Sequence, residues 1–149
     1  LSSKFQQSKR NYVVDTSAVI NKFLPHLIKR GLQGRIIIPN AVMAELENQA
    51  NRGREEGFVG LEEITKLHKL PQIKLQFQGP RPGEMHIKFA KSGEIDALIR
   101  ETAIKNKAIL ITADLVQAKS SQAYGLKVLY IKPKTIPPKK KFLYFFKRR

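Results

Sequence analysis

Two runs of residues in this chain are apolar without alternation, and they limit the folds open to it more than any other feature. Ile36, Ile37 and Ile38 follow one another directly, and residues 108–111 form a second such run. A strand with one face in water alternates apolar and polar side chains, so we expect both of these strands to be buried on both faces. Such burial is typical of a parallel sheet covered by helices.

The remaining apolar patterns predict alternating strands and helices. Strands are expected at residues 12–14, 35–38, 108–111 and 128–131, and an edge strand with one wet face at 73–77. Helices are expected at residues 16–31 with a break at Pro25, at 40–51, at 58–70 after a connector punctuated by Gly53 and Gly57, from Ser92 or Gly93 to 105, and from Asp114 to 123. The pattern indicates an α/β doubly wound domain with a mainly parallel sheet.

The chain is strongly basic. It has 28 Lys and Arg residues against 12 Asp and Glu, a net charge of +16 in 149 residues. Residues 132–149 hold eight basic residues and no acid, and the rest still carries +8 from 20 basic against 12 acidic residues. This excess predicts a polyanionic partner, with nucleic acid ahead of a membrane surface or a ribosomal particle; solubility alone is the plainer explanation.

Other counts exclude several classes of protein. The chain has no cysteine, which excludes disulfides, thiolate zinc sites and a cysteine nucleophile and is typical of a reducing cytosol. No apolar run approaches the roughly 20 residues that span a bilayer, and no signal peptide is visible. We expect a cytoplasmic protein without a membrane, with a flexible lead-in at residues 1–11, one domain at 12–131, and a basic, Pro- and aromatic-containing tail or linker at 132–149.

Four acids are predicted to converge on one edge of the sheet. Ligands of such sheets bind outside the carboxyl ends of the strands. The acids placed there by the predicted elements are Asp15, Glu45, Asp96 and Asp114. Capping of helices explains Asp96 and Asp114 equally well, whereas Asp15 sits against a strand expected to be central. Glu94 leaves the inner stripe of its helix, so Asp96 is the better candidate.

The chemistry of such a cluster indicates a metal. Carboxylates gathered within a few ångströms raise one another's pKa values, and a divalent cation removes that penalty. A set of oxygen ligands without His or Cys fits Mg²⁺ or Mn²⁺ rather than zinc. In a basic protein, an acidic metal site has an obvious use, the hydrolysis of a phosphodiester bond.

Four segments in the right order resemble a known family of metal-dependent nucleases, the PIN domains. They are residues 13–17 (VVDTS), 38–46 (IPNAVMAEL), 93–99 (GEIDALI) and 111–114 (ITAD). Residues 48–54 (NQANRGR), with Gly57 and Gly60, are similar to archaeal PIN domains joined to an ATPase and a KH RNA-binding domain. The resemblance implies a PIN-like three-layer sandwich with strand order 3-2-1-4-5, and a tail that leads to ATPase and KH domains outside this chain.

The resemblance also implies roles for individual residues. The metal ligands and catalytic residues would be Asp15, Glu45, Asp96 and Asp114. Thr16, Ser17 and Thr112 would orient them or a bound water, or else cap the adjoining helices. Many PIN domains have a further acid two residues after the last Asp, where this chain has Val116.

The expected partner is nucleic acid, RNA ahead of DNA, together with further copies of the chain. The cations expected near the acids are Arg52, Arg54, Lys22, Lys91 and Lys119. A solvated surface explains them equally well. Two functions follow: a metal-dependent endoribonuclease-type nuclease acting on single-stranded RNA or structured or branched DNA, or a non-catalytic nucleic-acid-binding or assembly module of a larger ATPase.

Overall fold

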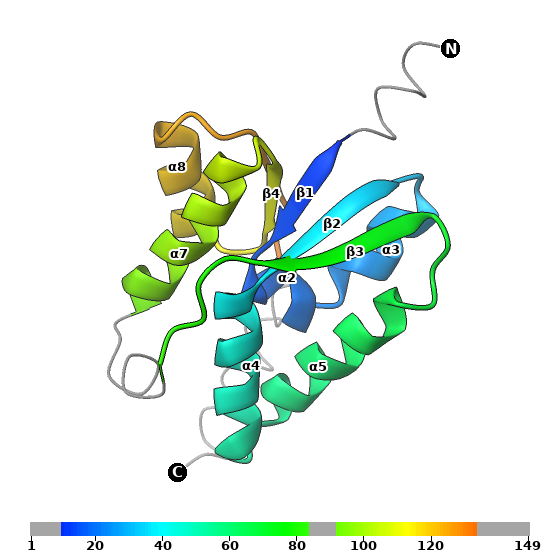
Figure 1. The fold of residues 1–149 in the computed structure, drawn as a ribbon, viewed down its shortest axis with the longest axis vertical. Helices are drawn as coiled ribbons and strands as arrows, with labels where there is room; N and C mark the ends of the chain where they lie inside the picture. Colours follow the sequence, from blue (N-terminus) through cyan, green and yellow to red (C-terminus); the bar gives the residue numbers. More distant parts are fainter. Residues whose placement is uncertain (1–9, 84–91, 134–149) are drawn as a thin grey trace, which may run out of the picture.

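A computed structural model of the chain describes residues 10–83 and 92–133, and within these ranges it contains one parallel sheet and six helices (Figure 1). The strands are β1 (Asn11–Val14), β2 (Gly34–Pro39), β3 (Ile73–Gln78), β4 (Ile109–Thr112) and β5 (Val128–Tyr130). The helices are α2 (Thr16–Ile20), α3 (Phe23–Lys29), α4 (Asn40–Asn51), α5 (Glu55–Leu67), α7 (Ser92–Lys105) and α8 (Leu115–Ala123). The predicted α/β class is confirmed.

All strand pairs are parallel, and the strand order is 3-2-1-4-5, as the resemblance implied. The sheet is most deeply buried where the sequence is continuously apolar: Ile36, Ile37 and Ile38 of β2 and Val13 of β1 have no exposed surface. At the edge, β3 follows the predicted alternation at its start, where Ile73 is buried and Lys74 exposed, but Phe77, which the alternation places on the apolar face, is 41% exposed.

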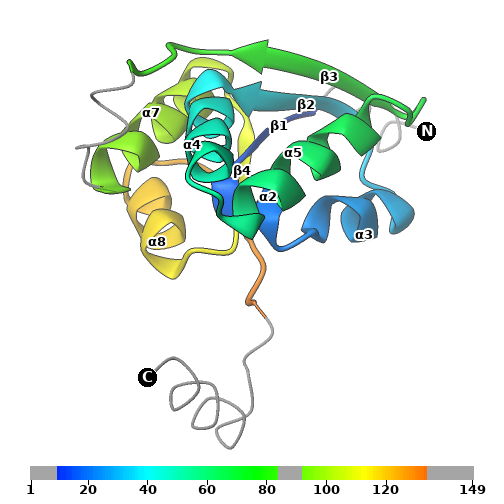
Figure 2. The same ribbon diagram turned by 90° about the horizontal axis from the view of Figure 1, so that it is seen from below.

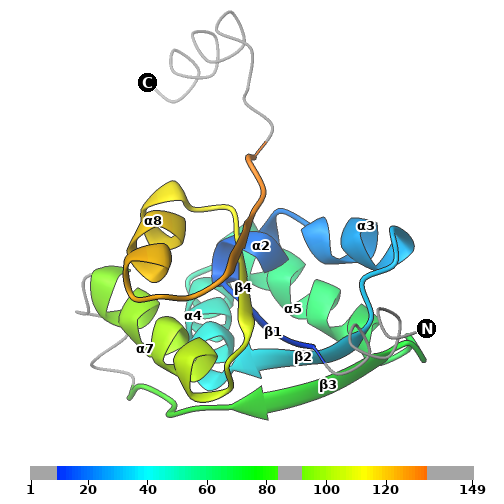
Figure 3. The ribbon, with the colours of Figure 1, turned by 90° about the horizontal axis from the view of Figure 1, so that it is seen from above.

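Helices cover both faces of the sheet. In the two views turned by 90° from Figure 1, α7 and α8 lie on one side of the sheet and α2, α3 and α5 lie on the other (Figures 2 and 3). Helix α4 leaves the carboxyl end of β2 and lies beside α7. The two groups arise because the chain moves outward through β1, β2 and β3 and then returns across the sheet to β4, so right-handed connections place the later helices on the opposite face. In the described ranges, no helix combines the length and apolarity that a bilayer span would need.

The first helical segment is broken, but not where the sequence suggested. The break falls at Lys22, which lies between α2 and α3 in the left-handed conformation with φ 60°. Pro25 is the third residue of α3, in a first turn where its missing N–H is not needed. Asn40 also differs from its predicted capping role: its side-chain amide donates to the Gly79 carbonyl oxygen (2.7 Å), and this bond ties the end of β3 to the start of α4.

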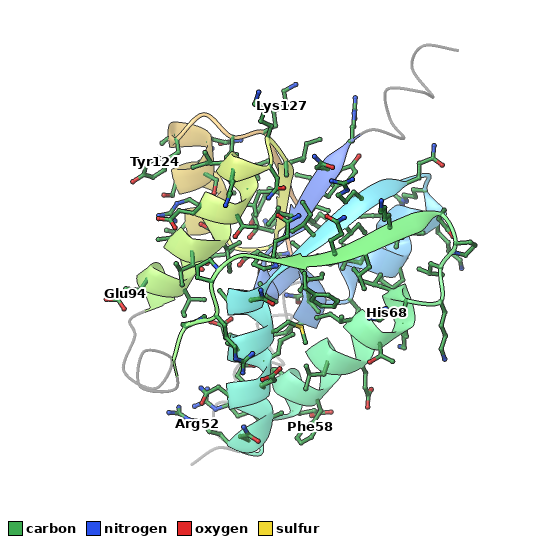
Figure 4. The ribbon with its side chains drawn as sticks, in the orientation of Figure 1. Arg52, Phe58, His68, Glu94, Tyr124 and Lys127 are labelled. Atoms are coloured by element: carbon green, nitrogen blue, oxygen red, sulfur yellow. The ribbon has the colours of Figure 1, made fainter. Side chains whose placement is uncertain are left out.

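The prediction that Gly57 separates two elements was wrong. Helix α5 begins at Glu55, so Gly57 and Gly60 lie inside it, both buried. A Cβ on Gly57 would stand 2.3 Å from the Ala50 backbone N, and one on Gly60 would stand 2.4 Å from Leu46 Cδ2. Gly57 therefore allows α5 to pack directly on the backbone of α4, and Gly60 leaves room for the Leu46 side chain between the two helices. Phe58, predicted to be in the apolar stripe of this helix, is 53% exposed as a result (Figure 4).

Parts of two predicted segments lie outside the described residues. Of the lead-in at 1–11, the structure describes only residues 10 and 11, and Asn11 already belongs to β1. Of the tail at 132–149, it describes residues 132 and 133. Lys91, one of the predicted phosphate contacts, also lies outside the described residues.

The close packing of α5 on α4 predicts that Gly57→Ala will destabilise the fold. The added methyl group has no space against the backbone of Ala50, so we expect a loss of about 2–3 kcal/mol in the free energy of unfolding, measured with urea. Gly93→Ala is the matched control: it lies in the first turn of α7 with no atom within 4 Å of the added Cβ, and it should be neutral or slightly stabilising. Equal stability of the two variants would contradict this packing.

Candidate active site

Asp15 lies at the carboxyl end of β1 and caps α2, with 3% of its surface exposed. Its Oδ1 accepts a hydrogen bond from the Thr16 backbone N (2.9 Å). Its Oδ2 accepts from the Ser17 hydroxyl (3.0 Å) and from the Thr112 hydroxyl (2.7 Å). Both oxygens are thus held by donors in a fixed position, and one of these donors comes from a strand 97 residues away in sequence.

The two hydroxyls connect the ends of β1 and β4. Thr112 Oγ1 accepts from the Asp114 backbone N (3.0 Å), and Ser17 Oγ accepts from the Ala113 backbone N (2.9 Å). Each hydroxyl has a single proton, and each directs it at Asp15. The 3.2 Å between Ser17 Oγ and Thr112 Oγ1 is therefore a contact between two acceptors whose protons are already used. Thr16 reaches Asp15 only through its backbone.

Asp114 is the N-cap of α8. Its Oδ1 accepts from the backbone N of Val116 (2.9 Å) and of Gln117 (3.4 Å). The capping role that the sequence left open for this residue is thus present. It occupies only one carboxylate oxygen: no hydrogen bond from the described residues reaches Oδ2, which remains available as a ligand.

The other two acids reach the same edge from longer helices. Glu45 lies in the second turn of α4 and Asp96 in the second turn of α7, and both are partly exposed. The pKa of Asp96 is raised to about 7. Burial is the main cause, and the charges of Asp15, Asp114 and Glu45 contribute to the same rise. Glu94, by contrast, is exposed at the start of α7 (Figure 4).

The pKa values of Asp15 and Glu45 are raised as well. For Asp15, burial outweighs the three hydrogen bonds that favour the charged form, and the Asp114 charge adds to the rise. For Glu45, burial again has the largest effect, followed by the nearby Thr16 hydroxyl, which lowers its pKa, and the Asp15 charge, which raises it. The Thr16 Oγ1 atom is buried and makes no hydrogen bond of normal geometry with the described residues. The four acids therefore affect one another electrostatically at one edge of the sheet.

The donor set suits a hard divalent cation. It consists of carboxylate oxygens with hydroxyls beside them, and a cation would offset the repulsion that raises the pKa of Asp96. In the side-chain positions seen here, no three carboxylates or imidazoles of the described residues are grouped closely enough to hold a metal ion. The chemistry of the residues fits Mg²⁺ or Mn²⁺.

Two residues that sequence reasoning missed connect the acids. Gln117 is 1% exposed; its side-chain amide donates to the Asp96 carbonyl oxygen (3.1 Å), while its backbone N donates to Asp114. Arg100 donates to Gln117 Oε1 (3.0 Å), and its charge lowers the pKa of Asp96. The position of Arg100, four residues after Asp96 on one helix, was a signal available in the sequence. That of Gln117 was not, because it depends on how α7 packs on α8.

The predicted phosphate contacts are less clearly placed. Lys22, Arg52, Arg54 and Lys119 are all exposed. Arg52 follows the last residue of α4, and Figure 4 shows it at the end of that helix away from the sheet. No hydrogen bond or ion pair within the described residues joins any of the four to the acids.

Comparison with known proteins gives one family. The model of the PIN domain family matches residues 12–121. An uncharacterized KH and PIN-domain containing protein of Methanocaldococcus jannaschii is 44% identical over 123 residues, which cover 79% of this chain and 19% of that protein. The Holliday junction branch migration ATPase PINA of Sulfolobus acidocaldarius is 22% identical over 125 residues, 83% of this chain and 23% of that protein. The chain thus spans about a fifth of the length of these relatives.

A solved structure supports the fold in detail. A domain of a functionally unknown protein from Methanocaldococcus jannaschii is 40% identical and superposes with a TM-score of 0.80, covering 87% of this chain and 96% of that one.

The bridge from Thr112 to Asp15 predicts a large cost for Thr112→Val. The variant keeps the side-chain volume but removes one of the three donors to the buried Asp15 carboxylate and leaves the Asp114 backbone N without its partner, so we expect a loss of about 1–3 kcal/mol in the free energy of unfolding. Thr102→Val makes the same change at another buried threonine, whose hydroxyl bonds only to the Leu98 carbonyl of its own helix, and should cost less than about 1 kcal/mol. Equal losses of unfolding free energy in the two variants, measured with urea, would show that the Thr112–Asp15 hydrogen bond adds no more stability than an ordinary hydrogen bond within a helix.

The raised pKa of Asp96 predicts a pH-dependent stability. With a pKa of about 7 when folded and 3.8 when unfolded, Asp96 binds its proton more tightly in the folded state, so its contribution is fully present below pH 4 and is lost as the pH rises through 7. Asp96→Asn does not titrate, so relative to the wild type it should gain stability between pH 5 and pH 8, by on the order of 1 kcal/mol for this half-exposed group. Urea unfolding in EDTA at both pH values measures the gain, and a difference independent of pH would contradict it.

Proposed function

Because the chain belongs to the PIN-domain family, we propose that it is a divalent-metal-dependent nuclease of the endoribonuclease type. PIN domains are generally nucleases, and the proposal assigns this chain the hydrolysis of phosphodiester bonds in single-stranded RNA or in structured or branched DNA. The catalytic residues and metal ligands proposed are Asp15, Glu45, Asp96 and Asp114. Mg²⁺ or Mn²⁺ is the proposed cofactor.

One observation carries the proposal: acids from four separate elements influence one another at the carboxyl ends of the strands. The pKa of Asp96 reflects burial and then the charges of the other three acids. Four carboxyls placed this way cost the fold stability and satisfy no packing need, which is the pattern expected of a site kept for its chemistry. Capping explains the place of Asp15 and Asp114 but not that of Glu45 or Asp96, which lie in second turns.

The residues of the chain would divide the work as follows. A bound divalent ion supplies charge that offsets the phosphate oxygens and lowers the pKa of a coordinated water. Asp15, fixed by Ser17 and Thr112, provides a ligand with no freedom to rotate away. Asp114 offers the oxygen that does not cap α8. Asp96, whose pKa is raised to about 7 by burial and by the other three acids, would become a charged ligand when a cation offsets those charges.

The larger context is also part of the proposal. Since the matched segment makes up only about a fifth of each relative, we propose that this PIN domain works beside KH and ATPase domains in a longer protein, with nucleic acid as the shared partner. The printed name of the second relative, a Holliday junction branch migration ATPase, favours keeping branched DNA among the substrates to be tested. Cytoplasmic location and association of several copies stay predictions from the sequence.

A non-catalytic nucleic-acid-binding module is the second candidate. Val116 occupies the place where many PIN domains have a further acid, and it is 74% exposed. The acids as they stand do not enclose a metal ion. With one ligand fewer, this site would hold a second metal weakly. The function would then be nucleic-acid binding by the basic surface.

Cleavage by an Asp15→Asn variant tests the proposal. The full chain is incubated with 5′-labelled single-stranded RNA and with a four-way DNA junction, in MnCl₂, in MgCl₂ and in EDTA. We expect metal-dependent cleavage that falls by at least about 100-fold in Asp15→Asn, since the substitution removes a charged ligand. The matched control is Glu94→Gln, an exposed acid near the start of α7 that should keep wild-type cleavage.

The outcomes separate the two functions. Cleavage that survives Asp15→Asn in a protein with wild-type circular dichroism would come from a contaminant or another site and would end the proposal. Binding of the same RNA without any cleavage in Mn²⁺ would favour the non-catalytic module.

A further inference from the structure

The amino ends of the strands, at the sheet edge opposite the four acids, carry two neighbouring hollows. One of about 720 Å³ lies between β1, the turn before β4 and the turn before β5; one of about 500 Å³ lies across the starts of β1, β2 and β3. Arg10 and Asn11 line both hollows, so the two form one groove along this edge. The Asn11 side chain donates to the Asn106 carbonyl (3.2 Å), which fixes the backbone where the hollows meet.

The groove is basic throughout. Its cationic side chains, called here the amino-edge cations, are Arg10, Arg35, Lys74, Lys107 and Lys127. No acid is among the residues that line either hollow. None of the five makes an ion pair with another described residue, although the chain has acids elsewhere that could have been placed to neutralise them.

One of the amino-edge cations, Lys107, lies in a turn. It adopts the left-handed conformation with φ 50° in the turn that leads into β4. Glycine or asparagine takes this conformation at less cost than lysine does. A lysine at this position is exposed, lines the groove and adds to its charge.

The groove also has an exposed apolar side. Tyr124, 66% exposed, and Ile104, 46% exposed, line the larger hollow beside the cations. The Arg100 guanidinium lies 5.2 Å from the centroid of the Tyr124 ring. Figure 4 shows Tyr124 and Lys127 toward the end of the molecule where β1 begins, and Glu94 and Arg52 toward the other end.

From these features we infer that the amino edge of the sheet is a second nucleic-acid surface, which binds the phosphodiester backbone of a single strand through the amino-edge cations and stacks a base on Tyr124. Five unpaired cations in one groove attract a polyanion, and an exposed aromatic ring among them suits unpaired bases rather than a duplex. Within the described residues, no acid lines the groove to neutralise it.

This surface is separate from the acidic site. Arg10 precedes β1 and Asp15 follows it, so the whole strand lies between them, and the five residue steps from Arg10 to Asp15 span roughly 16 Å. A strand held in the groove therefore reaches the acids only after passing around the domain over several nucleotides. The groove would hold the nucleic acid at a distance from the site proposed for cleavage, and its existence does not depend on that cleavage.

Binding of the full chain to labelled single strands tests the inference. The probes are 5′-fluorescein 12-nucleotide oligo-U and oligo-dT in EDTA, so that no metal bridges phosphate to the acids. The groove variant is Lys107→Gly/Lys127→Gln, in which the glycine suits φ 50° and should leave the melting temperature unchanged or higher. Each lost phosphate contact removes about 0.7 from the salt slope and about fivefold in affinity at 0.1 M salt, so we expect about 25-fold weaker binding.

A charge-matched variant separates the groove from net charge. Lys69→Gln/Lys105→Gln removes the same number of positive charges, at two exposed lysines that line neither hollow. We expect a much smaller loss of affinity. Equal losses in the two variants would mean diffuse attraction and would overturn the inference, as would wild-type binding by the groove variant.

A crosslink provides direct placement. Oligo-U carrying 4-thiouridine, irradiated with the wild-type chain, should crosslink to the tryptic peptide 120–127, which contains Tyr124. Crosslinks confined to other peptides would overturn the inference. Because both measurements are made without metal, the groove can fail while Asp15-dependent cleavage stands, and the reverse.

Discussion

The hydrogen bond from Thr112 to Asp15 is the interaction on which the carboxyl edge of this domain depends. It joins the last residue of β4 to the residue after β1, and the same hydroxyl accepts the backbone N of Asp114. With Ser17, which bonds in the same way to Ala113, it makes the ends of the two central strands one hydrogen-bonded unit. Two of the four acids are thereby placed by a single pair of hydroxyls.

That unit rests on a sheet whose arrangement was largely readable from the sequence. Ile36 to Ile38 predicted a strand with no wet face, and the alternation at residues 73–77 predicted the edge. The strand order itself came from the resemblance, since the patterns alone fix which elements form but not their neighbours. The four acids affect one another at one edge because parallel strands bring their carboxyl ends together whatever the sequence distance between them.

What the sequence did not reveal depends on contacts between elements. Gly57 was predicted to end an element because glycine is a poor helix former. In the structure it lies inside α5, and its missing Cβ allows the close contact between α5 and α4. Gln117 looked like an ordinary polar residue of a short helix until α7 was packed beside it. The amino-edge cations are scattered from residue 10 to residue 127, and only the sheet topology brings them into one groove.

The four acids differ in how freely they can move. Asp15 is held by three donors, Asp114 by its cap, and the backbone at Asp96 by the Gln117 amide. Glu45 has the longest side chain and only the Thr16 hydroxyl close to it. In the proposed metal site, adjustment to ions of different radius would therefore fall mainly to Glu45, which extends from α4, the helix on which the two glycines of α5 pack. The preference of such a site for one cation over another would then depend on helix packing some distance from it.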